Sequence, residues 1–332
     1  MNIRERTEQL EDQILSPLGA KSCDAVRERL EPSCEIRTAY QRDRDRILHS
    51  KAFRRLKHKT QVYISPGDHY RTRMTHSLET AQISRTIARG LRLNEDLVEA
   101  VALGHDVGHT PFSHAGEEAL KEILGHYAHN EQSLRVVAYL EKDGQGLNLT
   151  NAVKDGIANH TGPHKPYTME GNIVRIGDRI AYLCHDYDDG MRAGLLSASQ
   201  IPERVVKVLG VKPSDMIRTM VRDMITVSQE VGEVKLSPPV QQAMDEFRQF
   251  MFTKVYNSPT LDDERRKAKY VVHKLYEHYM AYPETIPQEF ISKESRWGMK
   301  TTVVDYIAGL TDTYAIYLFE KLFVPSSGII KR

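Results

Sequence analysis

The chain has 332 residues, which is enough for one large domain or two modest ones with a sizeable buried core. Hydrophobic residues make up 40% of it and charged residues 27%, the ordinary balance of a globular protein. The net charge of +1 excludes a bulk field that would draw the chain to nucleic acid or to a membrane, so attraction for phosphates has to come from local patches.

The N-terminus and the cysteines favour a cytoplasmic protein. The opening stretch MNIRERTEQLEDQ is charged and lacks the apolar centre of a signal peptide, and no run of about 18 apolar residues predicts a transmembrane helix. The cysteines Cys23, Cys34 and Cys184 are odd in number and show no C-x-x-C spacing, so neither a disulfide framework nor a cysteine zinc site is indicated. A reducing compartment fits these cysteines best.

Helical periodicity dominates the chain, and alternating β-branched runs are scarce. Apolar residues recur at helical spacing from Leu78 to Leu91, and Asn94 is a candidate N-cap for a helix over 95–104. Further helices are predicted over 117–124, 132–140 and 173–184, with a turn at 144–148 and a loop containing Gly and Pro at 161–167. The last predicted helices are 216–227, 240–252, 269–280 and one or two within 303–323.

This pattern suggests three parts. Residues 1–35 are expected to be partly irregular, residues 36–200 to form a catalytic core, and residues 201–332 to form a C-terminal helical region packed on that core.

Histidines and acids gather in the stretch GHDVGHTPFSHAGEE, which supplies His105, Asp106, His109, His114 and Glu117. Neighbours on a helix point about 100° apart, so His105 and Asp106 reach one ion only if other elements complete its shell. Imidazole with carboxylate is a sensible ligand set for Mn, Fe, Ni, Co or Zn, whereas Mg prefers an all-oxygen site.

Two further ligands are available on other predicted helices. His76 opens one amphipathic helix, and Asp178 lies in another. Asp178, Tyr182 and Asp186 are spaced i, i+4, i+8, which places three polar groups on one stripe of a largely apolar helix. Such a stripe is typical of a cavity wall.

His114 and Glu117 are three residues apart and share a face if that segment is helical. A histidine oriented by a carboxylate is a general acid–base pair. Taken singly, each of these residues has an ordinary structural interpretation. His109 fits a supporting hydrogen-bond role better than direct ligation, and His126, His129 and His160 can be read as ordinary polar residues.

The order and context of these residues resemble the HD superfamily and, more narrowly, bacterial deoxyguanosine triphosphate triphosphohydrolases and their relatives. The similar stretches span nearly the whole chain: RDRDRILHSKAFRRLKHKTQV (42–62), HYRTRMTHSLETAQISRTIA (69–88), LGHDVGHTPFSHAGE (103–117), HNEQSLRVV (129–137), GLNLTNAVKDGIANHTGP (146–163), EGNIVRIGDRIAYLCHDYDD (170–189) and DYIAGLTDTYA (305–315).

This resemblance implies an all-α HD-domain fold with additional C-terminal helices. It implies a divalent metal ion (Mn, Mg, Co, Ni, Fe or Zn) held by His76, His105, Asp106 and Asp178, and hydrolysis of a deoxynucleoside triphosphate to deoxynucleoside and inorganic triphosphate. His114 and Glu117 match the catalytic pair. Gln61, Tyr182 and Asp186 match deoxyribose contacts, while Asn130 and His160 are weaker matches near the substrate. Members of this family are commonly oligomers, often hexamers.

Phosphate contacts are expected from arginines beside the predicted ligands. Arg71 and Arg73 precede His76, and Arg179 follows Asp178; with His109, Arg73 and Arg179 complete the predicted substrate-binding set. The basic run 42–59 fits a phosphate-facing surface and a solvated helix face with Arg–Asp pairs about equally well. It lacks the interleaved aromatic residues of a single-stranded nucleic-acid groove.

Thr313 is a departure, because the family more often has Arg at this position and an Arg there would help to hold triphosphate.

Two other functions stay open on the sequence alone. One is an HD hydrolase acting on deoxynucleoside monophosphates or phosphodiesters, and the other is a nucleotide sensor without catalysis. The predicted acid–base pair beside a metal argues against a sensor, because a protein that only binds nucleotide has no need for such a pair.

Overall fold

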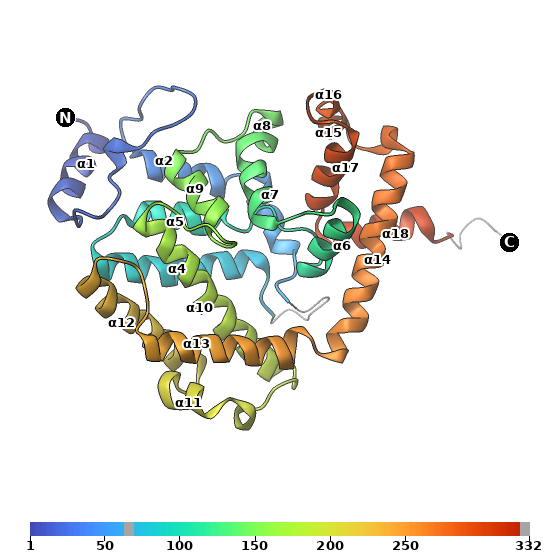
Figure 1. The fold of residues 1–332 in the computed structure, drawn as a ribbon. Helices are drawn as coiled ribbons and strands as arrows, with labels where there is room; N and C mark the ends of the chain where they lie inside the picture. Colours follow the sequence, from blue (N-terminus) through green and yellow to red (C-terminus); the bar gives the residue numbers. More distant parts are fainter. Residues whose placement is uncertain (63–69, 326–332) are drawn as a thin grey trace.

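The computed structural model describes residues 1–62 and 70–325 and is all-helical over that range, as predicted (Figure 1). The β-type pairing among these residues consists of two isolated bridges, Arg27 with Thr150 and Thr60 with Thr72. No helix in the described part is both long and apolar enough to cross a membrane.

The first half of the chain forms ten α-helices among the described residues. They are α1 (Ile3–Ile14), α2 (Ala39–Leu48), α3 (Lys51–Arg55), α4 (Arg73–Leu91), α5 (Glu95–Gly104), α6 (His114–Leu124), α7 (His129–Arg135), α8 (Glu141–Gly144), α9 (Asn151–Asn159) and α10 (Met169–Arg192). The short connecting helices are η1 (Ser22–Asp24), η2 (Leu56–His58) and the π-helix η3 (Val136–Leu140).

The second half continues with α11 (Glu203–Leu209), α12 (Pro213–Val231), α13 (Pro238–Met251), α14 (Pro259–Ala281), α15 (Gln288–Ile291), α16 (Glu294–Trp297), α17 (Met299–Ala308) and α18 (Asp312–Phe323). Its short helices are η4 (Ala198–Gln200), the π-helix η5 (Phe252–Tyr256) and η6 (Pro283–Thr285). The predicted helix or pair within 303–323 is a pair, α17 and α18.

Several helices begin earlier than the apolar periodicity predicts, because their ends are set by capping residues. Helix α4 starts at Arg73 behind the N-cap Thr72, and α10 starts at Met169 behind Thr168, whose hydroxyl accepts a hydrogen bond from Gly171 N. The prediction that Asn94 caps α5 is confirmed, since its side chain accepts a hydrogen bond from Leu97 N. Apolar periodicity marks the buried part of a helix rather than its ends.

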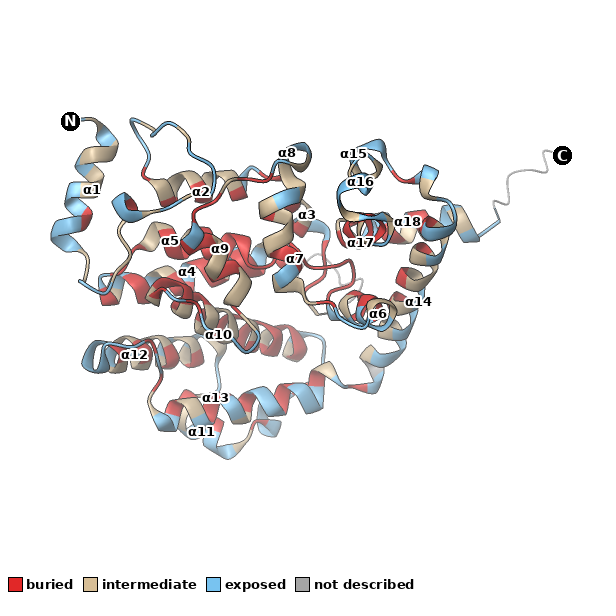
Figure 2. Cartoon of the chain, turned by 45° about the horizontal axis from the view of Figure 1, so that its top comes forward, coloured by how far each residue is buried: buried red, intermediate tan, exposed pale blue. Residues whose placement is uncertain are grey.

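A first hydrophobic cluster is built around α10, which packs against α4, α5, α9 and α12. Figure 2 shows the buried residues concentrated on these central helices. Helices α4 and α10 approach closely at Gly177, where an added Cβ would lie 2.3 Å from Ser84 Oγ. This cluster also takes in α2, α11 and α13.

A second hydrophobic cluster is separate from the first and combines distant parts of the chain. It joins residues 112–127 around α6 to residues of α14, α17 and α18, and α6 packs directly on α14. The boundary predicted near residue 200 stays a prediction. The clusters nonetheless show that α6 packs with the C-terminal helices rather than with the first cluster.

The N-terminal part begins with a capped helix, and residues 1–35 are otherwise mostly irregular. Helix α1 carries a capping box, in which Asn2 and Glu5 each accept a backbone hydrogen bond from the other. The start of the basic run 42–59 lies on α2, and its arginines pair with acids in this structure: Arg42 and Arg46 with Glu31, and Arg44 with Asp96. These pairs favour the solvated-face interpretation for that part of the run.

Candidate functional site

The four predicted metal ligands come from three helices that pack against one another. His76 lies in the first turn of α4, His105 is the C-cap of α5 with Asp106 directly after it, and Asp178 lies in the middle of α10. Because α4, α5 and α10 make mutual contacts, their polar residues meet inside the first hydrophobic cluster.

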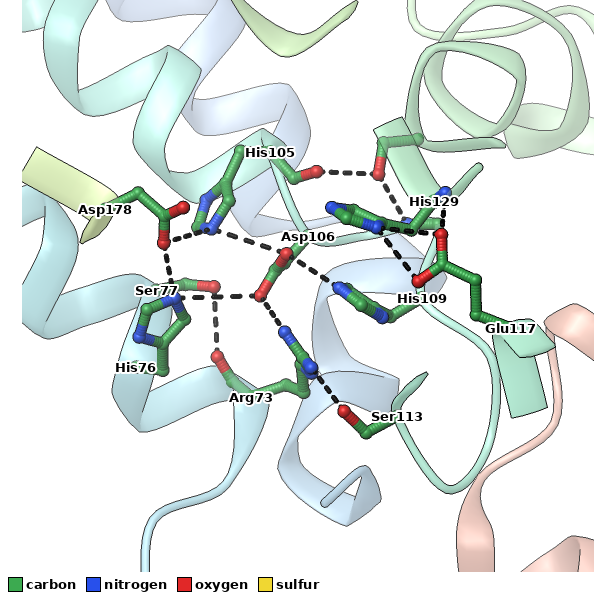
Figure 3. Close-up of polar contacts among 12 residues, drawn as sticks. Arg73, His76, Ser77, His105, Asp106, His109, Ser113, Glu117, His129 and Asp178 are labelled. Atoms are coloured by element: carbon green, nitrogen blue, oxygen red, sulfur yellow. Dashed lines mark hydrogen bonds and ion pairs between the residues drawn. The ribbon is translucent and has the colours of Figure 1, made fainter. Parts of the chain in front are cut away.

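The side chains of these residues converge (Figure 3). His76 Nε2 lies 3.0 Å from Asp178 Oδ1 and 3.8 Å from Asp106 Oδ2. His105 Nε2 lies 3.4 Å from Asp106 Oδ1 and 3.6 Å from Asp178 Oδ1. Ligand atoms about 2.1 Å from one ion are separated by roughly 3.0 to 3.4 Å in octahedral or tetrahedral geometry. The spacings of 3.0 and 3.4 Å suit a shared cation, and those of 3.6 and 3.8 Å are somewhat wider.

The unsatisfied atoms of this cluster also fit a metal ion. His105 donates from Nδ1 to Ala102 O at 2.6 Å, which leaves Nε2 facing the two carboxylates; this buried atom has no hydrogen-bond partner among the described residues. His76, His105 and Asp178 form one triad whose ligand atoms lie within 4.8 Å of one another. Asp106 belongs to two adjoining triads, one with His105 and His160 and one with His109 and His129.

Electrostatics prepare the cluster for a cation. Burial opposes ionisation of the two carboxyl groups, but the neighbouring histidines hold the pKa of Asp106 and of Asp178 well below the usual range. Burial also lowers the pKa of His105, yet Asp106 and Asp178 outweigh it and raise that pKa to about 9. Negative charge is therefore concentrated where the imidazoles converge, and a divalent ion can displace the proton from His105.

The predicted acid–base pair lies beside this cluster on α6. His114 Nδ1 is 3.3 Å from Glu117 Oε2, as the spacing predicted, and the His114 side chain is 67% exposed. Burial opposes ionisation of Glu117, but hydrogen bonds from His114 and His129 hold its pKa far below the usual range. Glu117 is thus a fixed anion that orients an exposed imidazole.

His129 is a site residue that the sequence analysis read as an ordinary polar side chain. Its Nδ1 lies 3.1 Å from Glu117 Oε1, its Nε2 lies 3.2 Å from His160 Nε2, and its ring stacks on His109 at 4.0 Å (Figure 3 shows the Glu117 contact). Its position at the start of the HNEQSLRVV stretch was the available signal. His126, by contrast, is exposed and pairs with Glu131.

Two predicted substrate-binding histidines, His160 and His109, are buried beside the cluster of predicted metal ligands. His160 donates from Nδ1 to Ile157 O at 2.8 Å, and burial, followed by the charges of His105 and His129, lowers its pKa to about 3. His109 Nε2 lies 3.2 Å from Asp106 Oδ1, which matches the supporting role expected of it. Asn130 is turned toward α9, because its side chain donates to Ala158 O at 2.6 Å.

Arg73 and Arg71 are engaged by protein groups. Arg73 is 3% exposed and donates to Asp106 Oδ2 at 2.7 Å and to Ser113 Oγ at 2.5 Å. Arg71 pairs with Glu79, Asp188 and Asp189. Arg73 therefore acts on the cluster by holding Asp106, and Arg71 is not turned toward it. Arg179 is half-buried, directly after the ligand position on α10.

The three residues matched to deoxyribose contacts differ in how they are satisfied. Gln61 is buried, and its Oε1 has no partner among the described residues. Tyr182 is half-buried, and burial, with the charge of Asp178, raises its pKa to about 12. Asp186 is buried, accepts a hydrogen bond from Tyr256 at 2.7 Å, and has its pKa raised by burial to about 7.

Comparison with known proteins agrees with this geometry. Residues 73–183 match the HD domain and residues 234–321 match the phosphohydrolase-associated domain. Three similar chains, each called deoxyguanosinetriphosphate triphosphohydrolase-like protein, come from Caldanaerobacter subterraneus subsp. tengcongensis, Desulfatibacillum aliphaticivorans and Clostridium tetani. They are 53%, 49% and 46% identical, over 98% of this chain and 97%, 99% and 97% of theirs.

The HD match contains the helices that bring His76, His105, Asp106 and Asp178 together. The phosphohydrolase-associated match covers most of the helices on which α6 packs. This chain belongs to the deoxyguanosine triphosphate triphosphohydrolase-like family of HD-domain phosphohydrolases.

Proposed function

We propose that this protein hydrolyses deoxynucleoside triphosphates to deoxynucleoside and inorganic triphosphate, using a divalent metal ion. The observation that carries the proposal is the position of the His114–Glu117 pair. It lies beside a buried cluster of histidines and aspartates that fits a cation. The relatives whose names mention deoxyguanosine triphosphate support the choice of substrate class.

His76, His105, Asp106 and Asp178 would hold the ion. When bound, it would supply positive charge to the phosphates and activate the attacking water. A mixed imidazole–carboxylate set suits Mn, Fe, Co, Ni or Zn better than Mg. Arg73 supports the proposed metal ligands, because its guanidinium donates hydrogen bonds both to the Asp106 carboxylate and to Ser113 Oγ.

The proton for the leaving 5′ oxygen would come from His114. Water attacks the α-phosphorus, the bond from phosphorus to the 5′ oxygen breaks, and the developing alkoxide takes a proton from the imidazolium. Glu117 stabilises that imidazolium and fixes its orientation, since its carboxylate accepts a hydrogen bond from His114 Nδ1. His129 holds Glu117 from its other side.

A sugar pocket is proposed along α10 and the segment before α4. Gln61 Oε1, which has no partner among the described residues, would accept a hydrogen bond from the 3′-hydroxyl. The Tyr182 ring would pack against the 2′ carbon, where an extra hydroxyl would not fit. Asp186 would contact the same side of the sugar, four residues further along the stripe.

The test is product analysis with the full chain. Each of the four deoxynucleoside triphosphates, with GTP as the ribose control, is incubated with Mn, Mg or Co and without metal, and the products are separated by ion exchange. We expect deoxynucleoside and intact triphosphate, only with metal present. Exposed His126 supplies the matched control: His126→Ala should keep the activity that His114→Ala loses.

Other outcomes identify other functions. Orthophosphate or pyrophosphate as the sole inorganic product would contradict the proposal. If single nucleotides and their mixtures are not hydrolysed, the proposal fails, and turnover of monophosphates or cyclic nucleotides would identify another HD hydrolase. Tight nucleotide binding without turnover, across all three metals, would identify a sensor.

A further inference from the structure

Asp312 is a buried acid outside the HD match whose carboxylate reaches two segments of the site. It is the first residue of α18 and is 8% exposed. Its Oδ2 accepts a hydrogen bond from Thr60 N at 2.8 Å, and its Oδ1 accepts one from Phe112 N, also at 2.8 Å. These partners are 252 and 200 residues away in sequence.

Each of these amides directly adjoins a proposed functional residue or its turn. Thr60 precedes Gln61, the candidate sugar contact. Phe112 begins the turn that leads through Ser113 into α6, where His114 is the first residue. One carboxylate thus connects the backbone before the sugar contact to the backbone before the proton donor.

The second of these segments needs such support because its backbone is strained. Phe112 and Ser113 have φ of 62° and 57°, in the left-handed region that non-glycine residues rarely adopt. Residues in sparsely populated conformations cost about 1 to 3 kcal/mol each and persist only where surrounding contacts fix them. Besides Asp312, the side-chain contacts that hold this turn include Arg73 on Ser113 Oγ, Ser113 Oγ on Gln61 O and Thr110 Oγ1 on Ser113 O.

Lys59 provides a second link between the same parts. It is 2% exposed and donates to Ala308 O at 2.7 Å and to His109 O. Burial lowers the pKa of Lys59 to about 7, and the negative charge of Asp312 opposes that shift. A buried carboxylate that accepts two amide hydrogen bonds is stable where an unpartnered one is not.

An ordinary role for an acid in the first turn of a helix is to interact with the helix dipole. The Asp312 carboxylate does not serve its own helix, because Thr311 caps α18 by accepting a hydrogen bond from Tyr314 N. Both Asp312 oxygens are instead directed to amides of other segments.

We propose that Asp312 is a positioning residue for hydrolysis, which holds Gln61 and His114 in register across the site. The effect of Asp312 on hydrolysis rests on the proposed function. Its role in holding the two backbone segments together does not. The phosphohydrolase-associated region thereby takes part in building the site.

The test compares Asp312→Asn with the full-length wild-type protein. An asparagine side chain has one acceptor oxygen and one amino group, so it satisfies one amide and opposes the other with N–H. We expect kcat to fall between about tenfold and a hundredfold, since misplacing a reacting group by about 1 Å has such an effect. KM for the nucleotide should rise several-fold as Gln61 shifts. Asp312→Glu keeps two acceptor oxygens and should recover part of kcat.

Hydrogen exchange supplies a readout that needs no substrate. Peptides containing the amides of residues 60 and 112 should exchange faster in Asp312→Asn and be partly protected in Asp312→Glu. The control is Asp223→Asn on α12, whose carboxylate likewise accepts two hydrogen bonds, one from the backbone amide and one from the hydroxyl of Ser237. That control should keep wild-type kcat.

Unchanged kcat and KM in a folded Asp312→Asn protein, or unchanged exchange at both amides, would overturn the proposal. An equal loss of kcat in Asp223→Asn would also overturn it, because the effect would then be general destabilisation. If the wild-type protein hydrolyses no nucleotide, the proposed function fails, and the exchange measurement alone decides whether Asp312 holds the two segments.

Discussion

The two halves of the candidate site are built on different hydrophobic clusters. The metal half comes from α4, α5 and α10 of the first cluster, and its ligands are deeply buried; Asp178, the most open of them, is 16% exposed at the side chain. The acid–base half comes from α6, which packs with α14, α17 and α18 in the second cluster, and His114 is 67% exposed.

Under the proposed function, this difference follows from what each half has to do. A cation is held by charged groups that are desolvated and fixed before it arrives, which requires a rigid, dry interior. A proton donor has to reach a leaving group on a substrate that enters from solvent, so it is fixed on one side by Glu117 and open on the other. The site therefore lies where a closed region meets an accessible one.

The largest effect expected is from the metal half. His105→Ala removes an imidazole whose Nε2 has no hydrogen-bond partner in the described part of the chain, so we expect the ion to be lost together with activity. The loss should be about a thousandfold or more, equivalent to about 4 kcal/mol of transition-state stabilisation. Metal content by elemental analysis and turnover should fall together. A variant that kept its metal would contradict the ligand assignment.

The acid–base half should fail in a different way. In His114→Ala we expect kcat to fall between about a hundredfold and ten-thousandfold, the usual contribution of a positioned acid or base. Metal content should be unchanged, because His114 lies on the other cluster. Loss of the ion in this variant would break the division into two halves.

The titration of Asp186 tests whether water is excluded from the interior of the metal half. Its unfolded carboxyl loses the proton near pH 3.8, whereas burial raises the folded pKa to about 7. Between these values the folded state holds a proton that the unfolded state has lost, so the contribution of Asp186 to stability falls from pH 4 to pH 7 and is constant above.

Asp186→Asn removes this titration. Relative to wild type, the variant should gain stability as the pH rises from 4 to 7, by up to about 4 kcal/mol. Denaturant unfolding of both proteins at several pH values, with a chelator present, measures the difference. A difference that does not change with pH would show that Asp186 is solvated and ionised in the folded state.

The smallest effect is expected at the exposed edge of the second half. Thr313 is exposed on the first turn of α18, next to Asp312, at the position where the family resemblance leads us to expect Arg. Thr313→Arg should lower KM for the nucleotide by up to about fivefold, since solvated ion pairs contribute roughly 0.2 to 1 kcal/mol. Steady-state kinetics at low and high salt measure it; an unchanged KM would exclude a phosphate contact from this position.

Sequence reasoning predicted the helices because they depend on local patterns. That His76, His105, Asp106 and Asp178 would meet was implied by the family resemblance. The 3.6-residue period marked α4, α5 and α10, and the spacing of His114 and Glu117 placed them on one face. His129 and Asp312 were not predicted as site residues. Each acts through a contact with a distant segment, such as Phe112 with Asp312 across 200 residues, and such contacts leave no period in the sequence.

The engagement of Arg73 was equally hard to foresee. Its position beside His76 suggested phosphate binding, but its guanidinium is occupied by Asp106 and Ser113. A neighbour in sequence is a poor guide to the direction of a long side chain at a helix start. The packing of α6 in the second cluster was also not predictable from local sequence, because it depends on how the C-terminal helices fold back onto it.

The packing of α6 sets a limit on how this protein can be divided. A fragment ending near residue 200 would retain every predicted metal ligand, yet it would leave Phe112, Ala119 and Leu120 without the residues of α14 and α17 that cover them. Such a fragment would present a new apolar surface to water and tend to aggregate. The smallest autonomous unit is therefore larger than the HD match itself, and transplanting this chemistry to another scaffold would require both clusters.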